Sequence, residues 1–135
     1  MAQNKVEVFF NYFPWVSNEF GNEYAYKKLT IYGRLSSVFD YFEVAGASQV
    51  VIRIKYRNRD GKILFRWIEP FSYRTEHGKF YLYALCRLHM HIHKWIPASV
   101  ITVTFSDTGL KYSNPENIKI ELGKSVQVVK NEKEK

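Results

Sequence analysis

The stretch HMHIH carries three histidines at every second position, namely His89, His91 and His93. Imidazole nitrogens can bind zinc or hydrogen-bond to a ligand, and they can equally form the polar side of a β-strand. Strand residues two positions apart are separated by about 6.6 Å, and those four positions apart by about 13 Å. Two of these histidines could therefore share one metal ion, whereas the third would need a sharp bulge. A metal site, an exposed polar face and a ligand-contacting face all stay open at this point.

A regular alternation precedes the histidines and places them in a strand. Apolar side chains occupy one set of alternate positions: Phe80, Leu82, Ala84, Cys86, Leu88, Met90 and Ile92. The other set carries Tyr81, Tyr83, Leu85, Arg87 and the three histidines. A period of two predicts a strand over 80–92 with one buried face, and this strand should bend or bulge midway because strands are usually shorter. Cys86 is then expected to be a small buried hydrophobe rather than a nucleophile.

The polar face of this strand could bind nucleic acid. Tyrosine rings offer stacking surfaces for bases, and arginine and histidine donate hydrogen bonds to phosphates. The candidate ligand-contacting residues are Tyr81, Tyr83, Arg87, His89, His91, His93 and Lys94. A second basic strip alternates along RIKYRNR and comprises Arg53, Lys55 and Arg57. Two structural roles compete with ligand binding, because charges can protect an exposed strand from aggregation and the tyrosines could pack beneath a helix or the N-terminal segment.

Composition narrows the function classes. The chain has 135 residues, enough for one domain, and 46% hydrophobic residues, enough to bury a core. A formal charge of +7 suits an anionic partner such as nucleic acid, although a basic soluble protein without one fits it equally well. The single cysteine permits no internal disulfide, and neither a signal peptide nor a membrane-spanning run is recognisable. We therefore expect a cytoplasmic protein that does not bind a membrane.

No enzyme signature is present in the sequence. A phosphate-binding glycine loop, GxSxG and HExxH are all missing, and the carboxylates are scattered without a spacing suited to acid–base chemistry. We therefore expect no enzyme, no catalytic residues, no cofactor and no metal site.

The N-terminal third is expected to contain two strands and the only clear helix. Strand segments at 5–13 and 22–32 form an aromatic-rich extension over residues 1–33. The helix is predicted over about 35–45, with Ser36 or Ser37 as its N-cap and Gly46 as its stop.

Several β-strands are expected after the helix. Turns are predicted at Asp60-Gly61 and at 75–78, and Pro70 should end a strand or lie on an edge. A short last strand is expected at 118–122, before a charged tail over 123–135 that should fray. The predicted fold class is mainly β (α+β), a small curved sheet or barrel with one packed helix.

The order of features over about 37–106 resembles a WYL domain. The matching pieces are VVIRIKYRNRDG, RWIEPFSYR, GKFYLYALCRLH and HKWIPASVITVTF, and Phe80-Tyr81-Leu82 stands where the family has Trp-Tyr-Leu. The resemblance covers about half of the chain and implies an SH3/Sm-like β-barrel over 34–122 that senses a ligand. Such domains bind nucleic acid or nucleotides and often regulate transcription or antiviral defence. They usually follow a helix-turn-helix, for which residues 1–33 leave no room, so a stand-alone module is implied.

The chain departs from the family pattern at three expected arginines. His93, Ile96 and Ser99 replace them, so three guanidiniums that could each bind phosphate bidentately are missing. The first hypothesis is a non-enzymatic regulatory module that binds single-stranded nucleic acid or a nucleotide, weakly or at a pH at which histidines are charged. The alternative is a protein-interaction module on a degenerate WYL scaffold, whose aromatic N-terminal segment docks a partner protein or a second copy in a homodimer.

Overall fold

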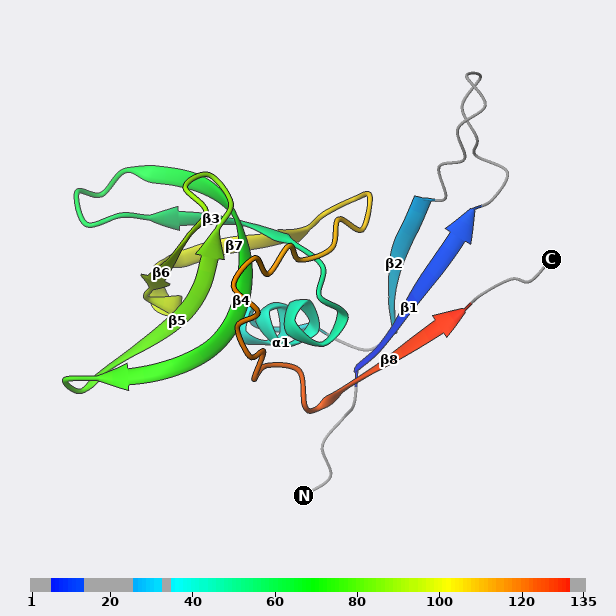
Figure 1. The fold of residues 1–135 in the computed structure, drawn as a ribbon. Helices are drawn as coiled ribbons and strands as arrows, with labels where there is room; N and C mark the ends of the chain where they lie inside the picture. Colours follow the sequence, from blue (N-terminus) through cyan, green and yellow to red (C-terminus); the bar gives the residue numbers. More distant parts are fainter. Residues whose placement is uncertain (1–5, 14–25, 33–34, 132–135) are drawn as a thin grey trace.

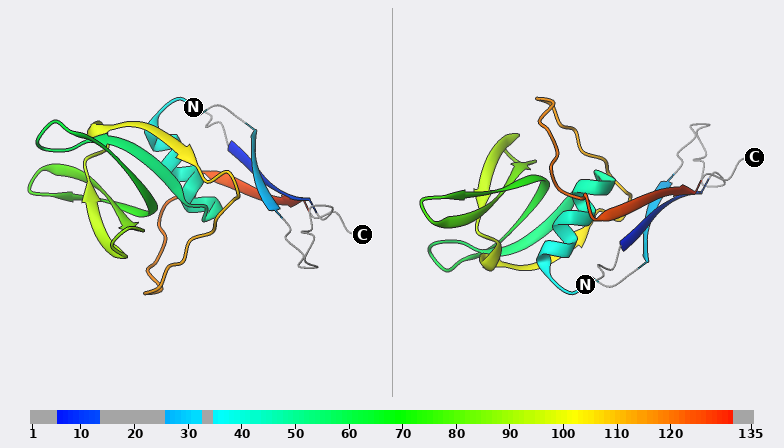
Figure 2. Two further views of the ribbon diagram at one scale, coloured as in Figure 1. Left: turned by 90° about the horizontal axis from the view of Figure 1, so that it is seen from above. Right: turned by 90° about the horizontal axis from the view of Figure 1, so that it is seen from below.

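The computed structural model describes residues 6–13, 26–32 and 35–131, which form two β-sheets and one α-helix (Figure 1). Five strands form one sheet in the order β6-β5-β4-β3-β7, and three form the other in the order β2-β1-β8. Helix α1 lies between the two sheets (Figures 1 and 2). No helix within the described residues is long and apolar enough to cross a membrane. The predicted fold class, mainly β with one packed helix, is confirmed.

The five-stranded sheet is antiparallel and strongly curved. Its strands are β3 (Ile52–Arg57), β4 (Ile63–Glu76), β5 (Lys79–Cys86), β6 (His91–Trp95) and β7 (Val100–Phe105). A short 3-10 helix at Pro97–Ser99 leads into β7, which pairs with β3. The curvature agrees with the predicted barrel (Figure 1), although the ladders between described residues do not join β6 to β7.

The concave face of this sheet packs against α1 and forms the core. Buried and more exposed side chains alternate along β3, as expected for a strand with one face turned inward, whereas residues 68–72 of β4 are buried on both faces. The core cluster comprises Ile52, Ile54, Ile68, Leu82, Ala84, Cys86, Trp95 and Val100 from the strands and their ends, Phe42 and Ala45 from the helix, and Leu122.

Helix α1 (Val38–Ser48) is the predicted helix with shifted ends. Ser37, one of the two expected residues, is its N-cap. The predicted stop at Gly46 is wrong, because the helix ends two residues later and Gln49 takes the left-handed conformation at its C-cap (φ 56°). Gly46 serves close packing instead, since a Cβ there would lie 2.6 Å from the Cβ of Leu122.

Strand β4 continues through Pro70, where the sequence predicted a strand end or an edge. The register with β5 shifts between Pro70 and Ser72. Pairing with β3 ends at Ile68, so in the ladders between described residues Pro70 has only β5 beside it and lies on a sheet edge, where a missing N–H is tolerated. The strand does not end there, but the predicted edge position of Pro70 is confirmed. The predicted turns at Asp60-Gly61 and 75–78 are confirmed, and each connects two antiparallel strands.

The largest difference from the sequence prediction lies at the histidines. The predicted single strand over 80–92 is wrong, because β5 ends at Cys86, residues 87–90 form a tight turn, and β6 begins at His91. Met90 takes a left-handed conformation (φ 56°), and its N–H donates to the Cys86 carbonyl (2.6 Å). The turn RLHM contains no glycine, proline, asparagine or aspartate, so it lacks the usual turn signals.

The turn also changes which face of the sheet the residues after it occupy. Cys86 pairs with His91 and Ala84 with His93, so these two histidines share a face with Cys86 rather than with Tyr83. The side chains predicted for the core in and after the turn are exposed instead, at 65% for Leu88, 42% for Met90 and 38% for Ile92. Phe80, at the other end of the predicted face, is 43% exposed. The predicted alternation therefore holds over Leu82, Ala84 and Cys86 and fails on either side.

The chain after β7 differs from prediction as well. Residues 118–122, predicted to be the last strand, form no strand. The tail expected to fray contains β8 (Val126–Asn131), which pairs in parallel with β1 (Val6–Phe13). Strand β1 pairs on its other side with β2 (Tyr26–Tyr32). The two predicted N-terminal strands are thus confirmed where the structure describes them, whereas the rest of 1–33 and residues 132–135 lie outside the described residues.

Candidate ligand-binding groove

A hollow of about 400 Å³ opens between the turn that joins β3 to β4 and the hairpin of β5 and β6. We call it the basic groove. Its cationic residues are Arg57, Arg59, Arg66 and Lys94. Its other lining residues are Tyr56, Asn58, Cys86, His89, His93, Trp95, Ile96 and Ser99.

Positive charge dominates the basic groove, since none of the described residues that line it is an aspartate or a glutamate. The Arg57 guanidinium donates to the Gly61 carbonyl (3.2 Å), and that of Arg66 donates to the Phe65 carbonyl (2.8 Å). These acceptors are neutral, so they orient the guanidiniums without cancelling their charge. A phosphate or carboxylate group of a ligand would find charge-assisted donors here.

The three positions where the WYL resemblance expects arginines all lie in the basic groove. These positions are His93, Ile96 and Ser99. Burial lowers the pKa of His93, and positive charge on His89, His91 and Arg66 lowers it further. His93 therefore stays neutral to a lower pH than an ordinary histidine and does not replace an arginine's permanent charge.

Tyr81 and Tyr83 lie on the opposite face of the sheet from the histidines. The Tyr83 hydroxyl donates to the Glu76 carboxylate, and the Lys94 ammonium pairs with the same carboxylate (2.9 Å). The Lys94 ammonium also lies 4.8 Å from the centre of the Tyr81 ring. The hydrogen bonds from Tyr83 and then from Lys94 lower the pKa of Glu76. The tyrosines and Lys94 therefore form a separate cluster around Glu76, and the single ligand surface predicted from the sequence is divided.

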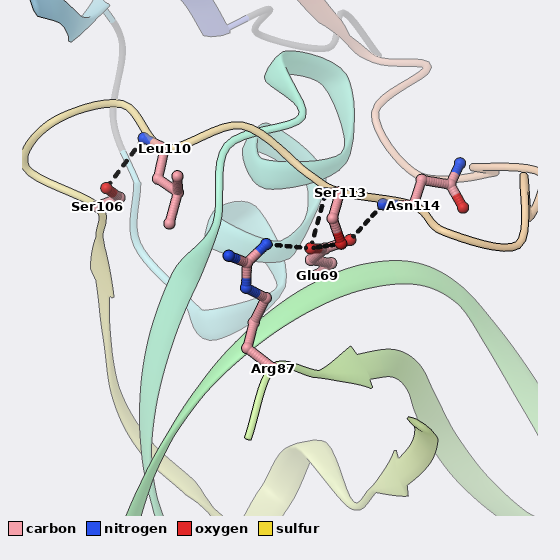
Figure 3. A network of polar contacts seen from close by, with 6 residues as sticks. All are labelled: Glu69, Arg87, Ser106, Leu110, Ser113 and Asn114. Atoms are coloured by element: carbon pink, nitrogen blue, oxygen red, sulfur yellow. Dashed lines mark hydrogen bonds and ion pairs between the residues drawn. The ribbon is translucent and has the colours of Figure 1, made fainter. Parts of the chain in front are cut away.

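Arg87, also a candidate for ligand contact, is engaged by a buried carboxylate (Figure 3). Its guanidinium donates to Glu69 (2.8 Å), whose side chain is fully buried. Glu69 accepts three more hydrogen bonds, from the N–H (2.9 Å) and hydroxyl (2.8 Å) of Ser113 and from the N–H of Asn114 (3.1 Å). This network fastens the segment after β7 to β4, so Arg87 has a structural partner that its position in the sequence does not reveal.

The Glu69 network should make folding sensitive to acid. Burial raises the pKa of Glu69, but the hydrogen bonds from Ser113, Arg87 and Asn114 outweigh burial and bring it below the ordinary 4.5. A carboxyl group with a lower pKa in the folded state stabilises the fold above its unfolded pKa, and this contribution is lost as the pH falls. We expect the free energy of unfolding, measured by urea denaturation, to decrease as the pH falls below 4.5. Glu69→Gln should show a shallower decrease, and an equally steep one would contradict this role.

Arg53 and Lys55 lie outside the basic groove, and only Arg57 of the predicted second strip lines it. Arg53 stacks over two exposed rings, with its guanidinium carbon 4.9 Å from the centre of Phe65 and 5.8 Å from that of Trp67. We call this surface the aromatic face, defined by Arg53, Phe65, Trp67 and Leu88. These residues line a second hollow of about 390 Å³ together with Arg66 and Arg87. Arg66 therefore borders both hollows.

Sequence reasoning did not single out Arg66 as a site residue, although a signal was present. Leu64, Arg66 and Ile68 lie opposite Tyr56, Ile54 and Ile52 in the β3–β4 ladder, so the three share the concave face. An arginine at an inward position between two apolar residues needs a polar environment. In the structure the opening of the basic groove provides that environment.

Comparisons with known proteins bear on the fold. No protein-family model matches this chain, and no curated protein matches its sequence. A solved structure, the proteasome accessory factor B/C (PafBC) of Arthrobacter aurescens, is similar to it with a TM-score of 0.51. The similarity covers 57% of this chain at 23% sequence identity. It covers only 12% of that chain, so it shows a shared fold with a small part of a longer protein.

Proposed function

We propose that this chain is a non-enzymatic, regulatory WYL-like module whose basic groove binds single-stranded nucleic acid. The observation that carries the proposal is the cluster of Arg57, Arg59 and Arg66 around one hollow whose described lining contains no acidic residue. Arginine is suited to this task because its planar guanidinium matches the geometry of phosphate oxygens. Regulation of transcription or antiviral defence is the setting that the resemblance implies.

Two further observations support a WYL-like module. The positions of the three expected arginines, His93, Ile96 and Ser99, converge on the basic groove although none of them is arginine. The fold is shared with part of PafBC, whose C-terminal region contains a WYL domain. Guanidiniums reach the same hollow from the β3–β4 hairpin, which carries Arg57, Arg59 and Arg66. The ligand's phosphate would therefore be bound from this hairpin and not from β6 and the residues that follow it.

The aromatic face favours a nucleic acid strand over a free nucleotide. Phe65 and Trp67 are 48% and 41% exposed and therefore offer stacking surfaces to bases. Arg66 belongs to both hollows, so a strand whose phosphates lie in the basic groove could stack its next bases on the aromatic face. A nucleotide would use only the first of these surfaces and should compete weakly.

The double substitution Arg57→Ala with Arg66→Ala tests the proposal. We expect it to weaken binding of labelled single-stranded DNA and RNA by about tenfold, because two phosphate contacts are lost. Each lost contact should also lower the slope of log K against log salt concentration by about 0.7. Fluorescence anisotropy at several salt concentrations measures both quantities, with unlabelled nucleotides as competitors.

Arg74→Ala with Lys119→Ala serves as the matched control, since it removes the same charge outside both the basic groove and the aromatic face. Arg74 lies over the Tyr83 ring at 5.5 Å on the far face, and Lys119 is exposed in the segment after β7. This control should lose less affinity than the groove variant. Absence of binding by the wild-type protein, or equal losses in the two double variants, would refute the proposal for the basic groove.

A second candidate function, assembly with a protein, is favoured by the exposed apolar residues of the aromatic face. Phe65, Trp67 and the 65% exposed Leu88 form a larger apolar surface than scattered single residues would. The partner would be a second copy of the chain or another protein. Size-exclusion chromatography with light scattering separates the candidates, because a dimer that Trp67→Glu dissociates while nucleic acid binding persists would favour assembly.

A further inference from the structure

The turn between β5 and β6 gathers three metal-binding side chains that one continuous strand would have kept apart. The chain reverses after Cys86, so His89 lies in the turn and His93 returns along β6 on the same face as Cys86. One donor atom from each residue, the Cys86 sulfur and a ring nitrogen of each histidine, lies within 4.8 Å of the other two. The Cys86 Sγ and the His89 Nδ1 are 3.7 Å apart.

These distances fit the donor set of a zinc ion. Zinc binds thiolate at about 2.3 Å and imidazole nitrogen at about 2.0–2.1 Å, so tetrahedral geometry puts sulfur and nitrogen ligands about 3.6 Å apart. The Cys86–His89 pair already has this separation. The third donor, on His93, would need only a small side-chain rotation, and His89 and His93 are exposed enough to move.

We propose that Cys86, His89 and His93 form a zinc site at the inner end of the basic groove. The spacing Cys-x2-His-x3-His places all three ligands on one hairpin, as short ligand spacings do in small zinc sites. Thiolate and imidazole select zinc and similar transition metals over calcium or magnesium, which prefer oxygen ligands. Binding converts the Cys86 thiol to a thiolate and releases its proton to the solvent.

The surroundings leave the fourth coordination position open toward the basic groove. Cys86 is buried, with 1% exposure, whereas the two histidines lie at the surface of the same hollow. Zinc with one thiolate ligand keeps a net positive charge, and Arg57, Arg59 and Arg66 line that hollow as well. The fourth ligand is therefore an anion or a water molecule of the groove rather than a further protein carboxylate, because none of the described lining residues has one.

The zinc site does not depend on the proposed nucleic acid binding. Its ligands contribute none of the permanent charges of the basic groove, and the groove arginines donate no metal ligand. Arg57→Ala with Arg66→Ala should therefore leave zinc affinity intact or increase it, because two cations are removed from the vicinity of the ion.

The test uses the full chain without a histidine tag, stripped with a chelator and dialysed. Zinc affinity is measured by competition with a chromophoric chelator, and Co²⁺ is added separately as a spectroscopic probe. We expect one zinc ion per chain and, with Co²⁺, the near-ultraviolet charge-transfer band of a thiolate–cobalt bond. Cys86→Ser should abolish that band, and His89→Gln or His93→Gln should weaken zinc binding by more than about tenfold, since even partners of ligands contribute that much.

His91→Gln is the matched control, because His91 stands between the two histidine ligands in sequence but is not part of the converging set. It should bind zinc like the wild type. His89 lies in an exposed turn, so His89→Gln tests the site even if a substitution at buried Cys86 impairs folding. The proposal is overturned if the wild type does not compete with the chelator for zinc, if Cys86→Ser retains the cobalt charge-transfer band, or if His91→Gln loses as much affinity as His89→Gln.

Discussion

Glu69→Ala should lower the free energy of unfolding by about 3–5 kcal/mol, the loss typical of removing one partner of a buried ion pair. The Glu69 side chain is fully buried and accepts hydrogen bonds from Arg87, Ser113 and Asn114. Its removal leaves these donors without their acceptor and leaves a cavity between β4 and the segment that follows β7. Urea denaturation near neutral pH, followed by far-ultraviolet circular dichroism, measures the loss.

Glu76→Ala is the control for this substitution, because Glu76 also pairs with a cation and belongs to the same strand. Its ion pair with Lys94 is exposed to solvent, and exposed pairs contribute little to stability. Glu76→Ala should therefore have a much smaller effect. Similar losses in the two variants would mean that the buried network does not fasten the segment after β7.

Gly123→Ala is expected to destabilise the protein by about 2–5 kcal/mol, because a positive φ costs a non-glycine residue about 1–2 kcal/mol and overpacking about 1–3 kcal/mol. Gly123 has φ +95°, and a Cβ there would lie 2.5 Å from the backbone nitrogen of Ala47 and 2.6 Å from its Cα. Its N–H also donates to the Glu43 carboxylate of α1 (2.6 Å). Backbone atoms of a helix cannot move aside as a flexible side chain can. Thermal and urea denaturation of the variant measure the effect.

Gly61→Ala separates the two contributions, since Gly61 has a similar φ of +85° but no atom within 4 Å of an added Cβ. This variant should lose only the conformational part, about 1–2 kcal/mol. Equal losses in the two variants would show that the contact between Gly123 and the helix is not tight in solution.

Much of the fold follows from short-range patterns in the sequence. Alternation identified β3 and β5, and aromatic-rich strand segments identified the first two strands. Asp60-Gly61 identified a hairpin because that pair readily adopts the required turn. The fold class followed from these elements. The same reasoning failed for β8, whose residues VQVVKN precede a charged tail and gain strand structure by pairing with β1 at the far end of the described chain.

The site was less predictable, because it depends on one turn without turn residues. A four-residue turn at 87–90 makes even-numbered residues of β5 share a face with odd-numbered residues of β6. Continuing the alternation through this turn puts the histidines on the wrong face and separates them from Cys86. The spacing Cys86-x2-His89-x3-His93 was the available signal, but it indicates a metal site only once the chain is known to reverse there.

Ion pairs between residues far apart in the sequence were the other reason why the site could not be predicted. The partners of Arg87 and Lys94 are Glu69 and Glu76, each 18 residues earlier in the chain. No local sequence pattern predicts such pairs. The carboxylate partners of these two candidate ligand residues were therefore found only in the structure. Arg66 alternates with Leu64 and Ile68 in the sequence, but the β3–β4 ladder is needed to show that this face opens on the basic groove.

The parallel pairing of β1 with β8 has a consequence for synthesis on the ribosome. A hairpin such as β1–β2 forms in about 1–10 microseconds, but Val6 must wait for Val126 before its strand gains its second neighbour. At about 5–20 residues per second the nascent chain carries an open strand edge for several seconds. An open edge can accept a strand from another molecule. Until its own β8 is available, the edge of β1 is therefore open to a β8 strand from a finished copy of the chain.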